Sequence, residues 1–151
     1  MEGDKMTSAA QLFEHIVNIR KQYVALMNKR LSKFQLSTSQ WLVFKIIVQS
    51  RPESITLVEI AKIRNIEKPT ATKIIQYLLE QQLIETHTGK DKREKRLFAT
   101  QHGRNVYDQV MTMIQSTQDA LTPMDIELIT QTNEQLTQVY QALQSIQEKE
   151  D

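Results

Sequence analysis

Apolar residues recur at spacings of three and four along most of the chain, and this period is typical of amphipathic α-helices. It predicts helices over about residues 7–32, 37–50, 56–64, 68–79, 105–118 and 122–148. Residues 83–86 and 96–99 are predicted instead as two short strands around a charged loop. The pattern therefore indicates a mainly α fold with a small β-hairpin.

Two of these helices, the third and the fourth, are separated by a very short turn. Thr56 and Glu59 form the T-x-x-E pattern of a capping box, which predicts a helix start at Thr56. Asn65 tolerates the left-handed backbone that a tight turn between helices requires. Pro69 suits the first turn of the helix that follows. Together these signals predict a helix-turn-helix.

The second helix of this motif has an apolar stripe on one face and polar side chains on the other. In helix-turn-helix proteins such a polar face reads base edges in the major groove, for which Thr, Gln and Lys supply donors and acceptors. We predict DNA contacts from Lys68, Thr70, Thr72, Lys73 and Gln76, with Tyr77 on or beside the same face. Taken alone, a solvated helix face is the simpler interpretation, and the hairpin that follows reverses that preference.

The predicted hairpin, or wing, spans residues 83–100 and carries five cations among residues 90–96. Because these cations follow a recognition-helix pattern at the distance a wing requires, we favour phosphate binding over a merely solvated loop. The predicted contacts are Lys90, Lys92, Arg93, Lys95 and Arg96. Asp91 would repel phosphate, so we expect its carboxylate to hold the Arg93 guanidinium in a bidentate contact. Ile55 is expected to add a short third strand against the wing.

The net charge of +1 hides a strong asymmetry along the chain. Residues 62–104 have ten Lys or Arg and five acids, a net charge of +5, whereas residues 105–151 have one Lys and eight acids, a net charge of −7. Residues 1–61 have eight cations and five acids, a net charge of +3. Positive charge is concentrated on the predicted helix-turn-helix and wing, which favours nucleic acid as the partner.

These segments resemble the multiple-antibiotic-resistance regulator (MarR) family of winged helix-turn-helix proteins. Asp91-x-Arg93 and the run at 96–103 are similar to that family's wing and to its exit, which ends in Gly. Residues 36–41 are similar to the family's entry to its second helix, and residues 68–74 to its recognition helix. The resemblance implies a homodimeric transcription factor, most often a repressor, that binds double-stranded DNA at a pseudo-palindromic site and is often released by a small ligand.

The chain departs from the family pattern at two positions, since Gln82 stands where many members have Gly and Ala99 where Leu is usual. We expect Gln82 to alter how the wing is hinged.

The sequence contains no Cys, which excludes thiolate metal sites and the cysteine-based peroxide sensing known in part of the family.

Both ends of the chain are predicted to form a dimerisation region, from residues 7–34 and 105–148, around a DNA-binding lobe at 37–104, all within a single domain. The first helix has two apolar stripes, which is more than one core-facing side needs. The last helix, predicted to start with Thr122 as its N-cap, has apolar residues at alternating steps of three and four, as in a coiled-coil seam. The alternative is that these stripes cover only the chain's own core.

Effectors of the MarR family commonly lodge between the dimer helices and the DNA-binding lobe. By that resemblance, a candidate effector cleft is lined by Phe13, Tyr23, Met27, Phe34 and Trp41. The same residues fit a hydrophobic core, which is the better interpretation for any one of them. The helix at 37–50 is apolar almost all round and is expected to be the buried scaffold.

Signals of catalytic chemistry are missing from the sequence. The three His residues are far apart and show no metal-ligand spacing, and there is no P-loop, dinucleotide-binding turn or serine elbow. We therefore expect no enzyme, no cofactor and no metal site.

The sequence also contains no membrane-spanning stretch and no signal peptide, so we expect a cytoplasmic protein without a membrane partner. Three functions stay open: a ligand-responsive repressor, a constitutive DNA-binding regulator and a protein-interaction module.

Overall fold

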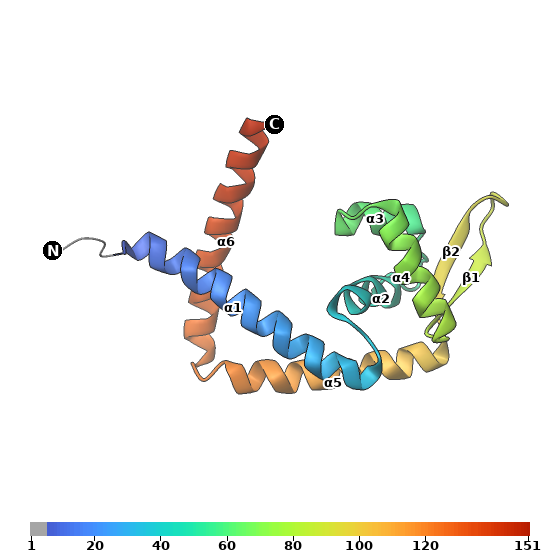
Figure 1. The fold of residues 1–151 in the computed structure, drawn as a ribbon, viewed down its shortest axis with the longest axis horizontal. Helices are drawn as coiled ribbons and strands as arrows, with labels where there is room; N and C mark the ends of the chain where they lie inside the picture. The colour runs from blue at the N-terminus through green and yellow to red at the C-terminus, as the bar shows by residue number, and fades with distance from the viewer. Residues whose placement is uncertain (1–5) are drawn as a thin grey trace. The chain divides into compact units, whose positions relative to one another are not determined.

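The computed structural model describes residues 6–151, which form two compact units, one ending at Met113 and one comprising Ile114–Asp151. The first unit contains α1 (Ser8–Leu31), the 3₁₀-helix η1 (Ser32–Phe34), α2 (Thr38–Gln49), α3 (Leu57–Arg64), α4 (Lys68–Glu80), β1 (Ile84–Thr88), β2 (Lys95–Ala99) and the first part of α5 (Gln101–Leu121) (Figure 1). The second contains the end of α5 and α6 (Ile126–Glu150). The predicted mainly α fold with a small β-wing is confirmed.

α2 is the buried scaffold of the first unit, as predicted. Its N-terminus has the expected capping box, in which the Ser37 hydroxyl accepts from the Gln40 N–H at 3.2 Å and the Gln40 amide oxygen accepts from the Ser37 N–H at 2.9 Å. Val43, Phe44 and Ile47 are buried. Because α2 contacts α1, α3, α4 and β2, it is the common support of the helix-turn-helix and the wing.

The helix-turn-helix forms where the sequence predicts it. The Thr56 hydroxyl accepts from the Glu59 N–H at 3.3 Å and caps α3, whereas the return contact from the Glu59 side chain is not among the hydrogen bonds of the described residues. Asn65 ends α3 in the left-handed conformation (φ 51°, ψ 51°), as expected for the turn. Pro69 lies in the first turn of α4, which begins at Lys68.

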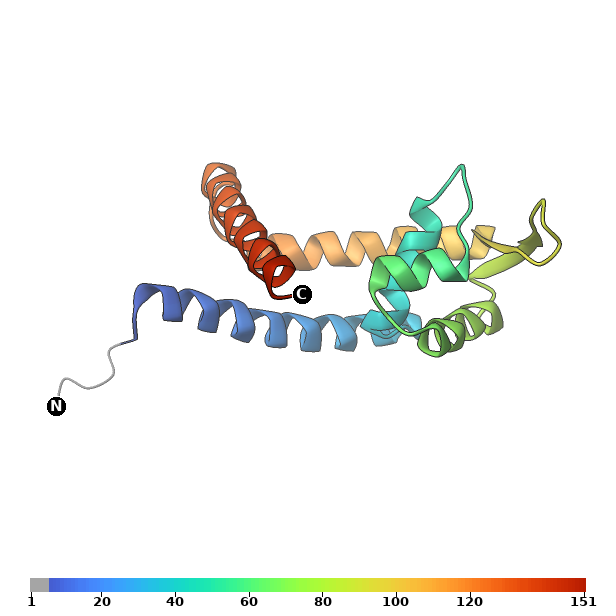
Figure 2. The ribbon, with the colours of Figure 1, turned by 90° about the horizontal axis from the view of Figure 1, so that it is seen from above.

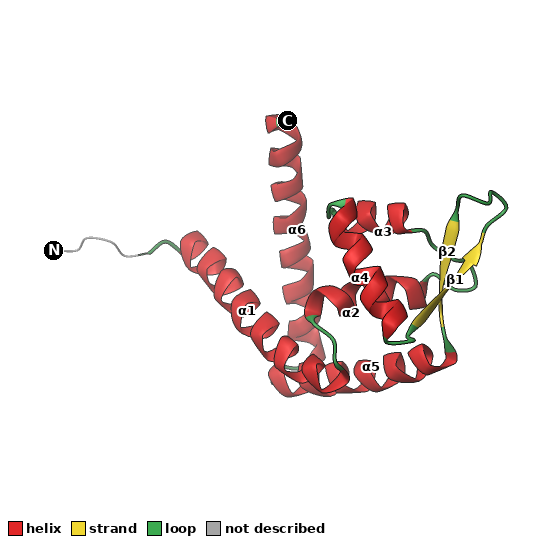
Figure 3. Cartoon of the chain, turned by 45° about the vertical axis from the view of Figure 1, so that its right-hand side comes forward, coloured by secondary structure: helices red, strands yellow, loops and turns green. Residues whose placement is uncertain are grey.

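The wing is an antiparallel hairpin of β1 and β2, with Ile84 opposite Ala99. Residue 55 joins it as predicted, since the Leu97 N–H donates to the Ile55 carbonyl at 2.9 Å and forms a single antiparallel bridge. In two perpendicular views, the wing and the start of α1 lie at opposite ends of the first unit (Figures 1 and 2). The two strands lie beside α4, and β1 contacts this helix (Figure 3).

The hinge between α4 and the wing contains Gln82, whose backbone is left-handed (φ 60°). Gly adopts this conformation most easily, which is a physical reason for the Gly that is usual here in the family that the sequence resembles. Thr100 holds the hinge from the other end of the wing. Its hydroxyl donates to the Gln82 carbonyl at 2.7 Å, and its N–H donates to the Leu83 carbonyl at 3.1 Å.

The junction of α5 and α6 differs from the prediction. The N-cap of the last helix is Asp125, whose carboxylate accepts from the Leu128 N–H at 2.9 Å, and the predicted N-cap, Thr122, instead donates its hydroxyl to the Gln118 carbonyl at 2.8 Å. Pro123 disfavours helical geometry at Thr122, in agreement with the end of α5 at Leu121. α5 also starts earlier than residue 105, at Gln101.

Candidate nucleic-acid interface

α4 presents one apolar and one polar face, as predicted. Ala71, Ile75 and Leu78 are buried against the first unit. Of the predicted DNA contacts in this helix, Thr70, Lys73 and Gln76 are exposed on the other face, and Lys68 is exposed in the first turn. The burial of the apolar stripe fixes the rotation of α4 about its axis, so Thr70, Lys73 and Gln76 point outward together.

Two residues of the predicted reading face are partly occupied by internal contacts. Thr72 is half-buried, and its hydroxyl donates to the Lys68 carbonyl at 2.9 Å, one turn earlier in the helix. The Tyr77 hydroxyl donates to the carbonyl of Gln35, at the end of η1. Tyr77 therefore links α4 to the segment between α1 and α2, and its expected place on the reading face is corrected.

The wing tip is a tight turn that presents four exposed cations. These are Lys90, Lys92, Arg93 and Lys95. The Gly89 N–H donates to the Glu94 carbonyl at 2.8 Å, and the Glu94 N–H donates to the Asp91 carbonyl at 2.9 Å, so the loop is closed by its own backbone. A closed loop holds the tip cations on a defined frame.

Asp91 acts within this turn in a different way from the one predicted. Its carboxylate accepts from the backbone N–H of Arg93 at 3.0 Å, and the expected bidentate contact with the guanidinium is not among the ion pairs of residues 6–151. Asp commonly makes this bond to the residue two positions later in a turn. Asp91 shapes the backbone of the tip and leaves the Arg93 side chain exposed.

Arg96 departs most from its predicted role as a phosphate contact. Its Nη2 donates to the Ser54 carbonyl at 2.7 Å, its Nε donates to the Ser54 hydroxyl, and its Nη1 donates to the Glu94 carboxylate. The partly buried guanidinium is therefore bound by acceptors of the protein itself. Sequence reasoning missed Ser54, which is 42 residues away from Arg96 along the chain and belongs to no periodic pattern.

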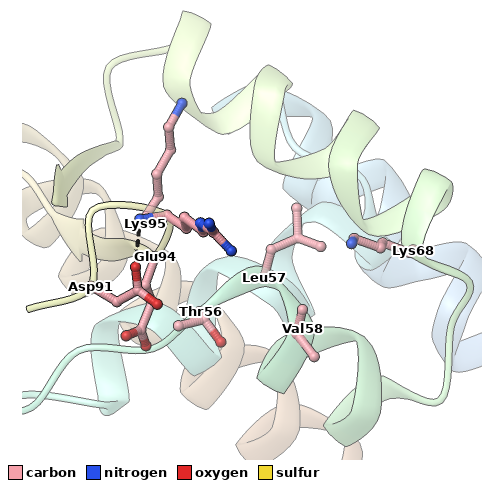
Figure 4. Close-up of a pocket in the computed structure, with 8 residues that line it drawn as sticks. Thr56, Leu57, Val58, Lys68, Asp91, Glu94 and Lys95 are labelled. Atoms are coloured by element: carbon pink, nitrogen blue, oxygen red, sulfur yellow. Dashed lines mark hydrogen bonds between the residues drawn. The ribbon is translucent and has the colours of Figure 1, made fainter. Parts of the chain in front are cut away.

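A hollow of about 540 Å³ lies between α3, the start of α4 and the wing. It is lined by Thr56, Leu57, Val58, Lys68, Asp91, Arg93, Glu94 and Lys95. In Figure 4, Leu57 and Val58 lie between Lys68 on one side and the wing residues Asp91 and Glu94 on the other. The fold thus brings cations of the predicted reading helix and of the predicted wing tip to one concave surface.

The residues of the candidate effector cleft do not form one cleft within a single chain. Trp41 and Met27 are buried, and the Trp41 ring stacks on Tyr107 with ring centroids 5.5 Å apart. Phe34 and Tyr23 are half-buried. Phe13 is 49% exposed and lies fourteen residues before Met27 on the same helix, a separation of about 21 Å. Trp41 and Met27 are therefore core residues, and Phe13 belongs to a separate surface.

The described part of the chain contains neither a cluster of metal ligands nor a membrane-spanning helix. Within residues 6–151, no group of three or more His, Asp or Glu side chains is arranged to hold a metal ion. His87 pairs with Glu85 at 3.2 Å on the exposed side of the wing. None of the helices in this range combines the length and the hydropathy needed to cross a bilayer.

Comparison with known proteins identifies the family. The model of the MarR family matches residues 34–94, the region from η1 to the wing tip. An uncharacterised HTH-type transcriptional regulator of Staphylococcus aureus strain Mu50 is 35% identical over 112 residues, which cover 74% of this chain and 75% of the relative. The HTH-type regulator YwoH of Bacillus subtilis is 32% identical over 97 residues, covering 64% of this chain and 69% of YwoH.

Solved structures agree with this match. Staphylococcus aureus MarR in complex with salicylate and kanamycin has a TM-score of 0.81 at 30% identity and covers 91% of this chain and 93% of its own. The transcriptional regulator SlyA has a TM-score of 0.72 at 25% identity, covering 87% of this chain and 93% of SlyA. The relatives named here are transcriptional regulators. The chain belongs to the MarR family of winged helix-turn-helix transcriptional regulators.

Proposed function

We propose that the protein is a sequence-specific DNA-binding regulator that acts as a homodimer on a pseudo-palindromic operator, most simply as a repressor. The observation that carries the proposal is the concave surface that Lys68, at the start of α4, lines together with Arg93 and Lys95 of the wing. A Staphylococcus aureus MepR–DNA complex, which shares the fold with a TM-score of 0.73 at 18% identity, is a precedent for the architecture.

In this proposal the exposed side chains of α4 and the wing have different tasks. Thr70, Lys73 and Gln76 contact base edges, with the remaining lone pairs of the Thr72 hydroxyl available beside them. Lys68, Lys90, Lys92, Arg93 and Lys95 neutralise phosphates. A sugar-phosphate strand is a suitable occupant of the hollow, because Lys68 and Arg93 line it from opposite elements.

Homodimerisation would cover apolar side chains that the single chain leaves exposed. On α1 these are Leu12, Phe13, Val17 and Ile19, which are 38–66% exposed. On α6 they are Ile126, Leu128, Leu136, Tyr140, Leu143 and Ile146, which are 38–81% exposed. Apolar surface of this extent favours a partner, and a two-fold dimer presents two recognition helices at the spacing of successive major grooves, about 34 Å.

Release of DNA by a small molecule is the finer part of the proposal. Its support is the structure of the Staphylococcus aureus relative in complex with salicylate and kanamycin. A constitutive regulator without an effector is the second candidate. A protein-interaction module is disfavoured, because a surface freed from DNA binding has no need for exposed cations at Lys68, Lys73, Lys92, Arg93 and Lys95.

Fluorescence anisotropy tests the proposal with the purified protein, the DNA upstream of its own gene and a scrambled duplex at two salt concentrations. We expect salt-dependent binding that prefers the upstream DNA and saturates at two chains per site. Absence of binding to both duplexes at low salt would exclude the proposed function. Addition of salicylate to the bound complex then tests whether this ligand releases the DNA, and a wider ligand screen separates the ligand-responsive from the constitutive regulator.

A further inference from the structure

We propose that Arg96 is a positioning residue that clamps the wing to the loop before the helix-turn-helix, and that it makes no DNA contact. The inference rests on the proposed DNA-binding function and assigns a task to one cation within it. Three nitrogens of the guanidinium donate to internal acceptors, namely the Ser54 hydroxyl, the Ser54 carbonyl and the Glu94 carboxylate. The Arg96 side chain is only 30% exposed.

The position of Ser54 makes this contact a clamp. Ser54 lies two residues before Thr56, the N-cap of α3, so a bond to it ties β2 to the entry of the helix-turn-helix. The neighbouring residues make a parallel connection, because the Leu97 N–H donates to the Ile55 carbonyl at 2.9 Å. A backbone bond and a side-chain fork, on adjacent residues of both segments, restrain the wing more strongly than either would alone.

Glu94 completes the clamp and removes Arg96 from the phosphate-binding charge. Its carboxylate binds the guanidinium from the residue just before β2, while its own backbone closes the wing turn with Gly89 and Asp91. The paired charges partly cancel, so Arg96 attracts phosphate less than the exposed cations of the tip do. The run of cations at 90–96 therefore contains two kinds of residue, four that face solvent and one that holds the frame.

Only arginine suits this arrangement, so a substitution by lysine distinguishes a clamp from a phosphate contact. The guanidinium directs several N–H groups along fixed directions from a planar fork, whereas lysine places one ammonium on a flexible stem. Arg96→Lys keeps the positive charge and loses the fork. A phosphate contact tolerates that exchange, and a clamp on three acceptors does not.

The experiment uses the full-length protein and its operator duplex, with anisotropy measured between 50 and 200 mM salt. We expect Arg96→Lys to weaken binding about tenfold while leaving the slope of log affinity against log salt unchanged. Arg93→Gln is the matched variant, and it should reduce that slope by about 0.9, the contribution of one phosphate contact. Wild-type affinity for Arg96→Lys, together with a slope reduced by about 0.9 for Arg96→Gln, would overturn the clamp and restore a phosphate contact.

Hydrogen exchange on the DNA-free protein tests the clamp separately from DNA binding. The Leu97 amide, bonded to Ile55, should exchange faster in Arg96→Lys than in the wild type, while amides at the centre of α2 keep their protection. Equal exchange at Leu97 in both proteins would contradict the clamp even if DNA binding is confirmed. Ser54→Ala, which removes one acceptor only, should accelerate the same amide less and serves if Arg96→Lys does not fold.

Discussion

Gly103 packs so closely on Leu83 that a Cβ atom at position 103 would lie 2.0 Å from the Leu83 carbonyl oxygen. The same carbonyl accepts the Thr100 N–H at 3.1 Å, so it is fixed from the exit of the wing. The first turn of α5 and the start of the wing therefore meet backbone against backbone. This contact explains in physical terms why the motif that follows the wing ends in Gly.

Gly103→Ala should lower the free energy of unfolding by about 3 kcal/mol, because neither backbone can withdraw without breaking its hydrogen bonds. Urea denaturation followed by circular dichroism measures the change. Gly89→Ala is the control, since its Cβ would lie no closer than 3.3 Å to the Glu94 carboxylate and 3.4 Å to the Glu94 carbonyl, and it should cost less than about 1 kcal/mol. Equal losses for the two variants would contradict the close contact at Gly103.

Arg93→Ala should weaken DNA binding across sequences and reduce the salt slope by about one phosphate contact, because its exposed side chain points from the wing tip. Gln76→Ala should mainly change which operator sequence is preferred. Competition binding with a small library of operator variants at two salt concentrations separates these effects. If the slope for Arg93→Ala equals that of the wild type, the wing tip does not bind phosphate through this residue.

Asn65→Val should destabilise the protein by about 2 kcal/mol, because a β-branched residue is strained in the left-handed conformation that the α3–α4 turn requires. Asn65→Gly, which accepts this conformation freely, should change stability by less than about 1 kcal/mol. Thermal unfolding of both variants provides the comparison. Comparable stability of the Val and Gly variants would show that the turn relaxes to another conformation.

Leu143→Glu should dissociate the proposed homodimer into monomers, because Leu143 is 50% exposed on α6 and belongs to the predicted seam. Gln141→Glu adds the same charge to the same helix outside that seam and should leave the dimer intact. Sedimentation velocity over a concentration series measures the association. A Leu143→Glu protein that sediments like Gln141→Glu would place the dimer interface elsewhere.

Features that depend on a few neighbouring residues were predictable from the sequence. The Ser37 capping box, the Thr56 N-cap and the left-handed Asn65 each follow from local hydrogen bonding or backbone preference. The predicted start of the last helix was wrong by three residues, since Thr122 and Asp125 are both good N-caps and the local pattern does not distinguish them. Local signals thus predict an element more securely than its boundary.

Contacts between distant segments were not predictable in the same way. Arg96 and Ser54 are separated by 42 residues, as are Tyr77 and Gln35, and nothing in the spacing of either pair indicates its partner. The charge run and its distance from the predicted recognition helix placed Arg96 among the phosphate-binding cations, because neither feature reveals which member of the run turns inward. The shape of the candidate site, in particular the hollow between α3, α4 and the wing, emerges only from the folded chain.

The bond from the Tyr77 hydroxyl ends on the main-chain carbonyl of Gln35, and every amino acid supplies such a carbonyl. The attachment of the recognition helix at this point is therefore robust to mutational drift at position 35, provided that the replacement accepts a left-handed backbone (φ 60°). This contact requires only a backbone conformation at position 35, whereas at position 77 it requires the hydroxyl group of the side chain. The donor and the acceptor of this hydrogen bond therefore place different requirements on the amino acids at positions 77 and 35.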